Sequence, residues 1–309
     1  MSALLFKEDL LFIEQEVTRV LREELKTRAV FPVDTNFNPA AREIGYDIFD
    51  ITGSAKIMAL GGNAKDIPFV GEEKERKTQA VYNIVTGIRY EEDEIEAVQG
   101  ARAMGKGSSF NLDAERPATA RRFISEKETQ VAFTGDAPHG IPGILDTSFY
   151  GASKGTKSTA VVKWDGTATP AQILADIRKL IKSSSKNGLF PGPKTVLLPF
   201  DQWFELSQPF NDGTESTILD WLQRSLPGQV NFEFFNMMED ANNGAFNTGN
   251  AMLVFTPRVD LVKLTVVQDI RMLTPVTDIL ENQELAIKEK TGGMVIKHPS
   301  SLSLMDGLT

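Results

Sequence analysis

The residues that could carry out chemistry in this sequence are few and widely spaced. There are two histidines, His139 between Pro138 and Gly140 and His298 before Pro299, and there is no cysteine. No spacing pairs either histidine with a serine or a carboxylate, so the sequence does not predict a catalytic triad. The lack of cysteine excludes a thiolate nucleophile, a disulfide framework and any thiolate-ligated zinc or iron–sulfur site.

The glycine-rich and charged stretches have simpler structural explanations. Gly105-x-Gly107 lacks the Gly-Lys-Ser/Thr ending of a phosphate-binding loop and follows a helical pattern, so it predicts a helix stop. The four carboxylates at 91–94 favour a helix start, and Arg121-Arg122 indicates a solvated helix face. We expect no catalytic, cofactor-binding or metal-binding residue and no enzymatic activity, with an α/β enzyme of unrecognised site as one alternative.

Composition narrows the class of protein further. The chain has 309 residues, of which 41% are hydrophobic and 24% charged, with a formal net charge of -9. A pI near 5.0 argues against a dedicated nucleic-acid binder, because polyphosphate affinity comes mainly from clustered Lys and Arg. The longest apolar run, 251–255, is far shorter than the ~20 residues of a membrane span, so no membrane partner is expected.

The first ninety residues predict elements that have no partner within one chain. Apolar residues at three- and four-residue steps indicate an amphipathic helix from Asp9 to Lys26. The Pro-containing stretch 29–42 should run extended and bury against neighbouring molecules. Two runs with a period of two, 44–48 and 82–90, predict an antiparallel hairpin whose tip is 53–77.

The remaining residues predict a mixed α and β texture. We expect helices at 91–104 and about 112–134, followed by a helix that Thr169-Pro170 opens and Asn187-Gly188 closes. Further segments are expected as strands at 195–198, 230–235 and 251–255, and as short helices at 203–206 and 216–225. Three successive strands, 259–267, 285–290 and 294–298, should close the chain.

Three stretches and a tail, in this order, resemble one family. They are FPVDTNFNPAAREIGYDIFDITGSAKI (31–57), GGNAKDIPFV (61–70), FISEKETQVAFTGDAPHGIPGIL (123–145) and HPSSLSLMDGL (298–308). Together they resemble the major capsid protein of tailed bacteriophages with the Hong Kong 97 fold, in particular an encapsulin-like capsid subfamily. The resemblance covers nearly the whole chain.

The resemblance implies an α+β fold with five parts. These are an N-terminal arm at 1–42, an extended hairpin loop at 43–90, a peripheral domain at 91–159 with a spine helix at about 112–134, an axial domain at 160–258, and C-terminal strands at 259–309 that return to the peripheral domain. Some relatives cross-link Lys to Asn between subunits; Lys56 and Lys65 lie in the loop, but no acceptor aligns, so that chemistry is not carried over.

The function implied by the resemblance is structural. The chain would self-assemble, as pentamers and hexamers, into an icosahedral shell around viral double-stranded DNA, assembled in the host cytoplasm and located in the virion. Portal, decoration and separately encoded scaffolding proteins would be partners, DNA contact would be non-specific, and no cofactor is implied. A host encapsulin shell that encloses a cargo enzyme is the alternative.

The charged residues of the predicted hairpin tip are the expected inter-subunit contacts. Exposed ion pairs add little stability within a solvated tip, whereas the same charges can set register and partner choice against a neighbouring subunit. The eight residues are Lys65, Asp66, Glu72, Glu73, Lys74, Glu75, Arg76 and Lys77.

Overall fold

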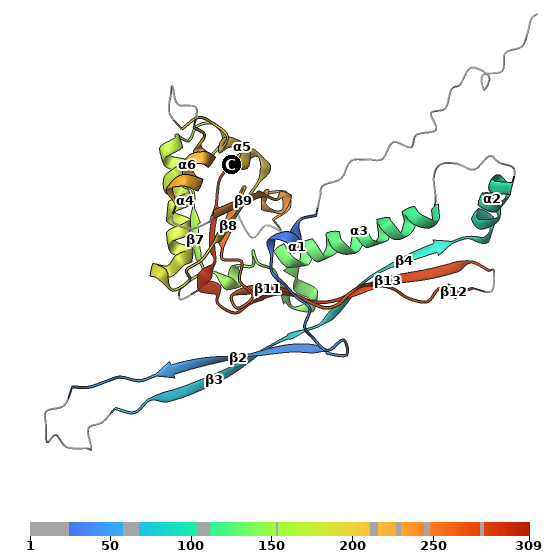
Figure 1. Ribbon diagram of the computed structural model, residues 1–309, viewed down its shortest axis with the longest axis horizontal. Helices are drawn as coiled ribbons and strands as arrows, with labels where there is room; N and C mark the ends of the chain where they lie inside the picture. The colour runs from blue at the N-terminus through green and yellow to red at the C-terminus, as the bar shows by residue number, and fades with distance from the viewer. Residues whose placement is uncertain are drawn as a thin grey trace, which may run out of the picture.

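The computed structural model describes residues 25–57, 68–103, 112–152, 154–210, 216–226, 230–243, 248–278 and 281–309. The described chain contains two five-stranded sheets, a separate hairpin and a long helix, α3, that lies along the first sheet (Figure 1). Nearly all of the arm helix expected at 9–26 lies outside these residues.

The first sheet has the strand order β1 (Val33–Asp34), β11 (Val262–Met272), β13 (Gln283–Ile296) and β12 (Val276–Thr277), and β4 (Tyr82–Tyr90) also pairs with β13. Helix α3 (Leu112–Phe133) packs against β4 and β13, where Ile88, Ile124 and Ile287 form a buried cluster. Helix α2 (Glu92–Ala103) links β4 to α3. Both predicted helices are confirmed within two residues.

The second sheet has the order β7 (Thr156–Thr159), β14 (Ser303–Asp306), β10 (Met252–Phe255), β8 (Lys194–Leu198) and β9 (Val230–Phe234). Its helices are α4 (Pro170–Ser185), α5 (Phe200–Glu205) and α6 (Ile218–Ser225). A capping box of Thr169 and Gln172 starts α4, and its apolar stripe packs onto the sheet. The sequence predicted the three helices and β8, β9 and β10, where apolar period and capping residues agree, whereas β7 and β14 were not predicted as strands.

Short elements complete the chain. Helix α1 (Thr27–Val30) precedes β1, and β5 (Gly135–Asp136) pairs with β6 (Ile141–Pro142) where α3 ends. Gly135 has a φ of 75°, and a Cβ there would lie 2.3 Å from the Ile141 carbonyl oxygen, so this turn requires glycine. The 3-10 helices are η3 (Ala137–His139), η4 (Thr147–Phe149), η5 (Lys186–Gly188), η6 (Asn236–Met238) and η7 (Pro299–Ser301).

The hairpin differs from the sequence prediction. Strand β2 (Glu43–Thr52) pairs with β3 (Gly71–Ala80), which lies in the stretch predicted as the tip, whereas β4 pairs with β13. The prediction was wrong because β3 is almost entirely polar and shows no apolar alternation. Its charged side chains find partners on β2 and in solvent rather than in a core.

The end of the chain also differs. The strands expected at 285–290 and 294–298 are one strand, β13, whose pairing with β11 shifts register near Gly292 and Gly293. Two adjacent glycines are typical of a turn between strands, but here they form an irregularity inside one strand. The end of the chain had been expected to return to the first sheet. The last strand, β14, pairs instead with β10 and β7 in the second sheet.

The start of the stretch 29–42, which had been expected to bury against neighbouring molecules, packs on its own chain. Phe31 is 1% exposed and stacks on Phe255 at 5.0 Å between ring centroids, with Phe133 edge-on at 5.5 Å. These rings belong to a core shared by both sheets. A deletion of residues 1–42 would therefore remove part of the core.

A cluster of charges fixes the same stretch. The Arg28 guanidinium donates to Glu128 of α3 at 2.8 Å, to Glu289 of β13 at 2.8 Å and to Asp269 of β11 at 2.9 Å. The side chains of Glu128 and Glu289 are 3% and 0% exposed. Burial, and then the neighbouring Glu128 carboxylate, raise the pKa of Glu289 to about 8. We call these four residues the Arg28 cluster.

The pKa of Glu289 predicts how stability depends on pH. The folded chain keeps a proton on Glu289 that the unfolded chain releases above its ordinary pKa of 4.5, so the free energy of unfolding should fall as the pH rises from there to about 8. Glu289→Gln, which stays neutral, should remove roughly 1–3 kcal/mol of that pH dependence. Denaturant unfolding of the unassembled full-length chain, followed by tryptophan fluorescence across this range, measures it.

Glu284→Gln is the matched control, because Glu284 lies on the same strand with a side chain that is 58% exposed. It should leave the pH dependence of the parent chain unchanged. The same slope in Glu289→Gln as in the parent would contradict the assignment of a retained proton to Glu289.

Candidate inter-subunit contact surfaces

The histidines do not form a catalytic site within the described residues. His139 Nδ1 pairs with the Asp136 carboxylate, and its ring lies edge-on to Tyr82 at 4.9 Å between centroids. His298 lies beside Phe190, at 6.0 Å between ring centroids. The described part of the chain contains no group of three His, Asp or Glu side chains that could hold a metal ion, and none of its helices is long and apolar enough to cross a membrane.

Two of the other charged residues picked out in the sequence, Glu94 and Arg122, form ion pairs. Glu94 pairs with Arg116 at 2.8 Å and so ties α2 to α3, and Arg122 pairs with Glu126 one turn along α3 at 2.8 Å. Arg121 is exposed. The glycine-rich stretch at 105–109 lies outside the described residues.

The hairpin of β2 and β3 carries large apolar side chains that are exposed. It projects from the body of the molecule (Figure 1). Phe49 is 65% exposed and Ile51 is 70% exposed, and beyond the strands Ile57 and Phe69 are 100% and 88% exposed. Large apolar side chains grouped on one projection are typical of surfaces that another protein covers.

The two faces of the hairpin carry different charges. On the face of Phe49, the Asp47 carboxylate binds Lys74 at 2.7 Å and Arg76 at 2.7 Å, and the Lys74 ammonium lies 5.3 Å from the Phe49 ring centroid. Hydrogen bonds from Arg76 and Lys74 hold the pKa of the Asp47 carboxyl far below its usual range. This face is therefore internally paired.

The opposite face has an unbalanced negative charge. Asp50 lies directly across from Glu73, and Glu75 follows two residues further along the same face. Like charges directly opposite one another destabilise a strand pair, and Lys77, the next side chain of β3 on this face, is the one cation that β2 and β3 set against these three carboxylates. A positively charged surface on another molecule would relieve the repulsion.

The eight predicted contact residues are only partly placed. Six of them, Glu72 to Lys77, lie on β3 and are exposed. Lys65 and Asp66 lie outside the described residues. Sequence reasoning did not select Phe49, Ile51 and Asp50. For the two apolar residues the signal was apolar content on both faces of β2, with Ile44, Tyr46 and Ile48 on one face and Phe49 and Ile51 on the other.

The base of the hairpin is held by the first sheet. Ile44 is 7% exposed and lies over Gly292, where a Cβ would come within 2.8 Å of the Ile44 Cδ1 atom. The Gln79 side-chain amide donates to the Gly292 carbonyl, and Tyr46 Oη donates to the Ile296 carbonyl at 3.4 Å. The direction of the hairpin is thus set by its own chain. Its outer half, which carries Phe49 and Ile51, is left uncovered.

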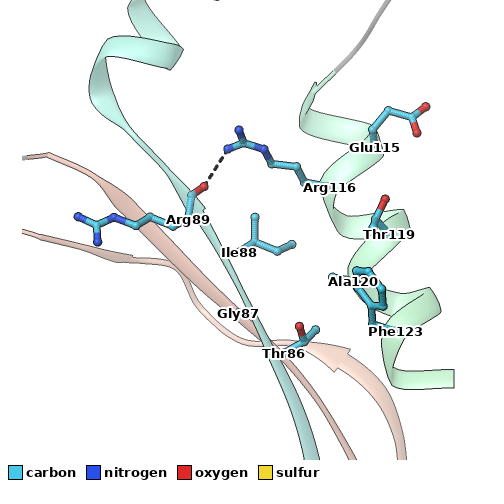
Figure 2. A pocket seen from close by; sticks show the side chains of 9 residues that line it. All are labelled: Thr86, Gly87, Ile88, Arg89, Glu115, Arg116, Thr119, Ala120 and Phe123. Atoms are coloured by element: carbon cyan, nitrogen blue, oxygen red, sulfur yellow. Dashed lines mark hydrogen bonds between the residues drawn. The ribbon is translucent and has the colours of Figure 1, made fainter. Parts of the chain in front are cut away.

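A groove lies between β4 and α3, as Figure 2 shows. Its volume is about 470 Å³, and Ile88, Ala120 and Phe123 form its apolar part. The Arg116 guanidinium crosses one end and donates to the Arg89 carbonyl at 2.8 Å. Phe123 is 45% exposed, so this groove is a second partly apolar surface of the first sheet.

Comparisons with known proteins agree on one kind of protein. A family model described as major capsid protein matches residues 53–308. The chain is similar to the capsid of Myoviridae phage XM1, with a TM-score of 0.81, 12% identity and all of both chains covered. It is similar to the capsid of a native GTA particle, with a TM-score of 0.69, 10% identity and 100% and 99% of the two chains covered.

A virus-like particle from Pyrococcus furiosus is also similar, with a TM-score of 0.57, 14% identity and 91% and 92% of the two chains covered. No curated protein matches the sequence.

Two isoleucines of β2 test the division between an anchored base and an uncovered outer half. Ile44→Ala should lower the free energy of unfolding of the unassembled chain by about 2–4 kcal/mol, because it leaves a cavity over Gly292. Ile51→Ala, the matched control on the same strand, should change it by no more than ~0.5 kcal/mol, because its side chain is already in solvent. Equal losses in urea unfolding would show that the outer half packs on its own chain.

Proposed function

The chain belongs to the major capsid protein family, and from this premise we propose how its surfaces build a shell. It is a structural protein of a viral capsid, it has the Hong Kong 97-like α+β fold, and it assembles with copies of itself. The predictions of family, fold class, capsid function and virion location are confirmed. The alternative of an α/β enzyme is excluded, because the family is structural. The alternative of a host encapsulin shell is not favoured by the family model.

Each part of the fold is assigned one role in this proposal. The first sheet with α3 forms the peripheral domain, the second sheet with α4, α5 and α6 forms the axial domain, and the β2–β3 hairpin is the extended loop. The separate sheets and the projecting hairpin support this division. The boundaries expected from the sequence shift in two places, since β4 belongs with the first sheet and β14 with the second.

The outer half of the hairpin contacts a second copy of the chain. The observations that carry this proposal are the exposed Phe49 and Ile51 on one face of the hairpin and the row of Asp50, Glu73 and Glu75 on the other face. The apolar side chains would supply buried area, and the acidic row would select a basic surface and fix the register. Lys65 and Asp66, beyond the described strands, are proposed to extend the same contact.

The remaining partners follow from the role of a shell protein. We propose pentamers and hexamers of the chain, which enclose double-stranded DNA and assemble in the host cytoplasm with portal, scaffolding and possible decoration proteins. The net charge of -9 supports weak, non-specific contact with DNA, because a strongly basic lining would bind polyphosphate tightly.

Particle formation by the purified full-length chain tests the proposal. Size-exclusion chromatography with multi-angle light scattering should find capsomers or closed particles, and negative-stain microscopy should show shells of uniform size. A chain that stays monomeric at all concentrations and salt conditions, with scaffolding protein supplied, would overturn it.

Reversal of the acidic row tests the contact itself. Glu73→Lys with Glu75→Lys should leave the circular dichroism spectrum unchanged but lower the particle yield in a salt-dependent way, because salt screens charges across the contact. Light scattering against ionic strength measures this yield. Glu73→Asp with Glu75→Asp keeps the charge and should assemble like the parent. Equal yields of the reversed and parent chains at every salt concentration would show that the acidic row faces water.

A further inference from the structure

The outer half of the first sheet, built from β4 and the paired parts of β13 and β11, turns one face away from α3. Side chains alternate between the two faces of a strand, and Ile88 and Ile287 lie on the face that packs against α3. The side chains next to them along the strands therefore lie on the opposite face. There, Val85 is 58% exposed and Arg271 is exposed.

Cations are set directly against one another on this face. Arg271 of β11 lies across from Lys288 of β13, and Lys290 follows two residues along β13 on the same face. Like charges directly opposite one another destabilise a strand pair. Among the described residues neither Arg271 nor Lys288 forms an ion pair, and the Lys290 ammonium donates to the neutral Pro39 carbonyl at 2.6 Å. We call Arg271, Lys288 and Lys290 the basic triple.

The carboxylates near the basic triple are bound elsewhere. Arg89 of β4 lies across from Glu284 of β13 on the same face, and their side chains form an ion pair at 3.8 Å. Asp269 and Glu289, the acids closest to the basic triple in the sequence, are bound in the Arg28 cluster. The basic triple therefore keeps an unbalanced positive charge in the single chain.

A shallow hollow adjoins the basic triple on the same face. It has a volume of about 520 Å³, and Gly87, Ala286 and Leu273 line it with Val276, which is 68% exposed. Gly87 and Ala286 lie across from each other on β4 and β13, and a Cβ on Gly87 would meet no described atom within 4 Å. These small residues leave room beside Lys288 for an apolar side chain of another molecule.

The acidic row of the β2–β3 hairpin has the same spacing and the opposite charge. Glu73 and Glu75 lie two residues apart on β3, and Asp50 lies directly across from Glu73. In the basic triple two cations likewise lie two residues apart on one strand, and the third lies directly across from one of them. Both arrangements span about 7 Å along a strand and about 5 Å between strands. Ile48, across from Glu75, adds an apolar side chain to the acidic face.

The acidic row and the basic triple of one chain lie on different sides of the base of the hairpin. This base rests on Gly292 of β13. From there the hairpin and the outer half of the first sheet run in opposite directions (Figure 1). The acidic row of one copy can therefore reach a basic triple only on a second copy.

We propose that the basic triple and the hollow of one copy receive the acidic row of the next copy's hairpin. The inference rests on the proposed function, since it names the surface on which the outer half of the hairpin lies. A contact between two different surfaces generates a ring when its rotation closes. The charges would fix the register, and Ile48 against the hollow would supply buried area. Phosphate groups could bind the three cations but would leave the apolar hollow unfilled.

A charge-swap experiment in the full-length chain tests the pairing. Arg271→Glu with Lys288→Glu should lower the yield of capsomers and particles at least about ten-fold, because it sets carboxylates against carboxylates at each contact. When Glu73→Lys and Glu75→Lys are added to these two substitutions, assembly should return to within about three-fold of the parent, since the pairs are present again with their sign reversed.

The matched control combines Glu73→Lys and Glu75→Lys with Lys179→Glu and Lys182→Glu, which reverse two exposed lysines of α4 in the second sheet. It has the same number of reversed charges and should not restore assembly. Circular dichroism of each unassembled variant checks the fold.

Arg271→Glu alone separates the contact from folding. It places a carboxylate directly across from Lys288, so an ion pair between β11 and β13 should form. The unassembled variant should therefore unfold at the parent's temperature or above it. Its particle yield should still fall at least about three-fold, because the new ion pair neutralises the surface that receives the acidic row.

Two outcomes would overturn the inference. One is normal assembly of the Arg271→Glu and Lys288→Glu chain while the parent also assembles, which would leave the proposed function intact. The other is a loss that the four substitutions together do not restore; weaker binding of duplex DNA by the Arg271→Glu and Lys288→Glu chain would then assign the basic triple to polyphosphate. A parent chain that never assembles would instead contradict the proposed function.

Discussion

The rest of the structure depends on the ion pairs between the Arg28 guanidinium and its three carboxylate partners. Two of its three carboxylate partners, Glu128 and Glu289, are almost completely buried, and because Glu289 keeps a proton up to a pH of about 8, the cation compensates the buried charge of Glu128. Removal of one member of such a cluster would leave buried charge without a partner, which is among the most destabilising changes in proteins. The cluster joins the stretch before β1, helix α3 and strands β11 and β13 at one point. It therefore fixes the stretch, the helix and the first sheet relative to one another.

This fixed point explains why the hairpin can project. Strand β1 adds to β11, and the chain then continues through 35–42 into β2, whose base rests on Gly292 of β13. The buried Ile44 and the exposed Ile51 are on the same strand, so one strand changes from core to surface within seven residues. A shell protein needs such a division, because the parts that meet other copies must keep their direction before those copies arrive.

The sequence predicted the elements whose local signals agree. Helix α4 has a capping box, a proline at its first position and a clear apolar stripe, and the buried strands β8 and β10 are short apolar runs. The partner of β2 was mispredicted because polar β3 lacks an apolar period, while β4 shows one that serves a different sheet. The Arg28 cluster could not be predicted, because its members are distant in the sequence and only the fold brings them together. The sequence indicated the charges of β3. It did not indicate how these charges divide between two faces, because that division depends on the pairing of β3 with β2.

Hydrogen–deuterium exchange of the unassembled and assembled full-length chain tests the central claim most directly. The account predicts that amides of 27–34 are protected in both states, because that stretch is bound to its own chain through Phe31 and Arg28. The strands of the outer hairpin, 46–52 and 71–77, should gain protection only on assembly, when a second copy covers them. Protection of 27–34 that appears only on assembly, or a hairpin that exchanges equally in both states, would contradict the account.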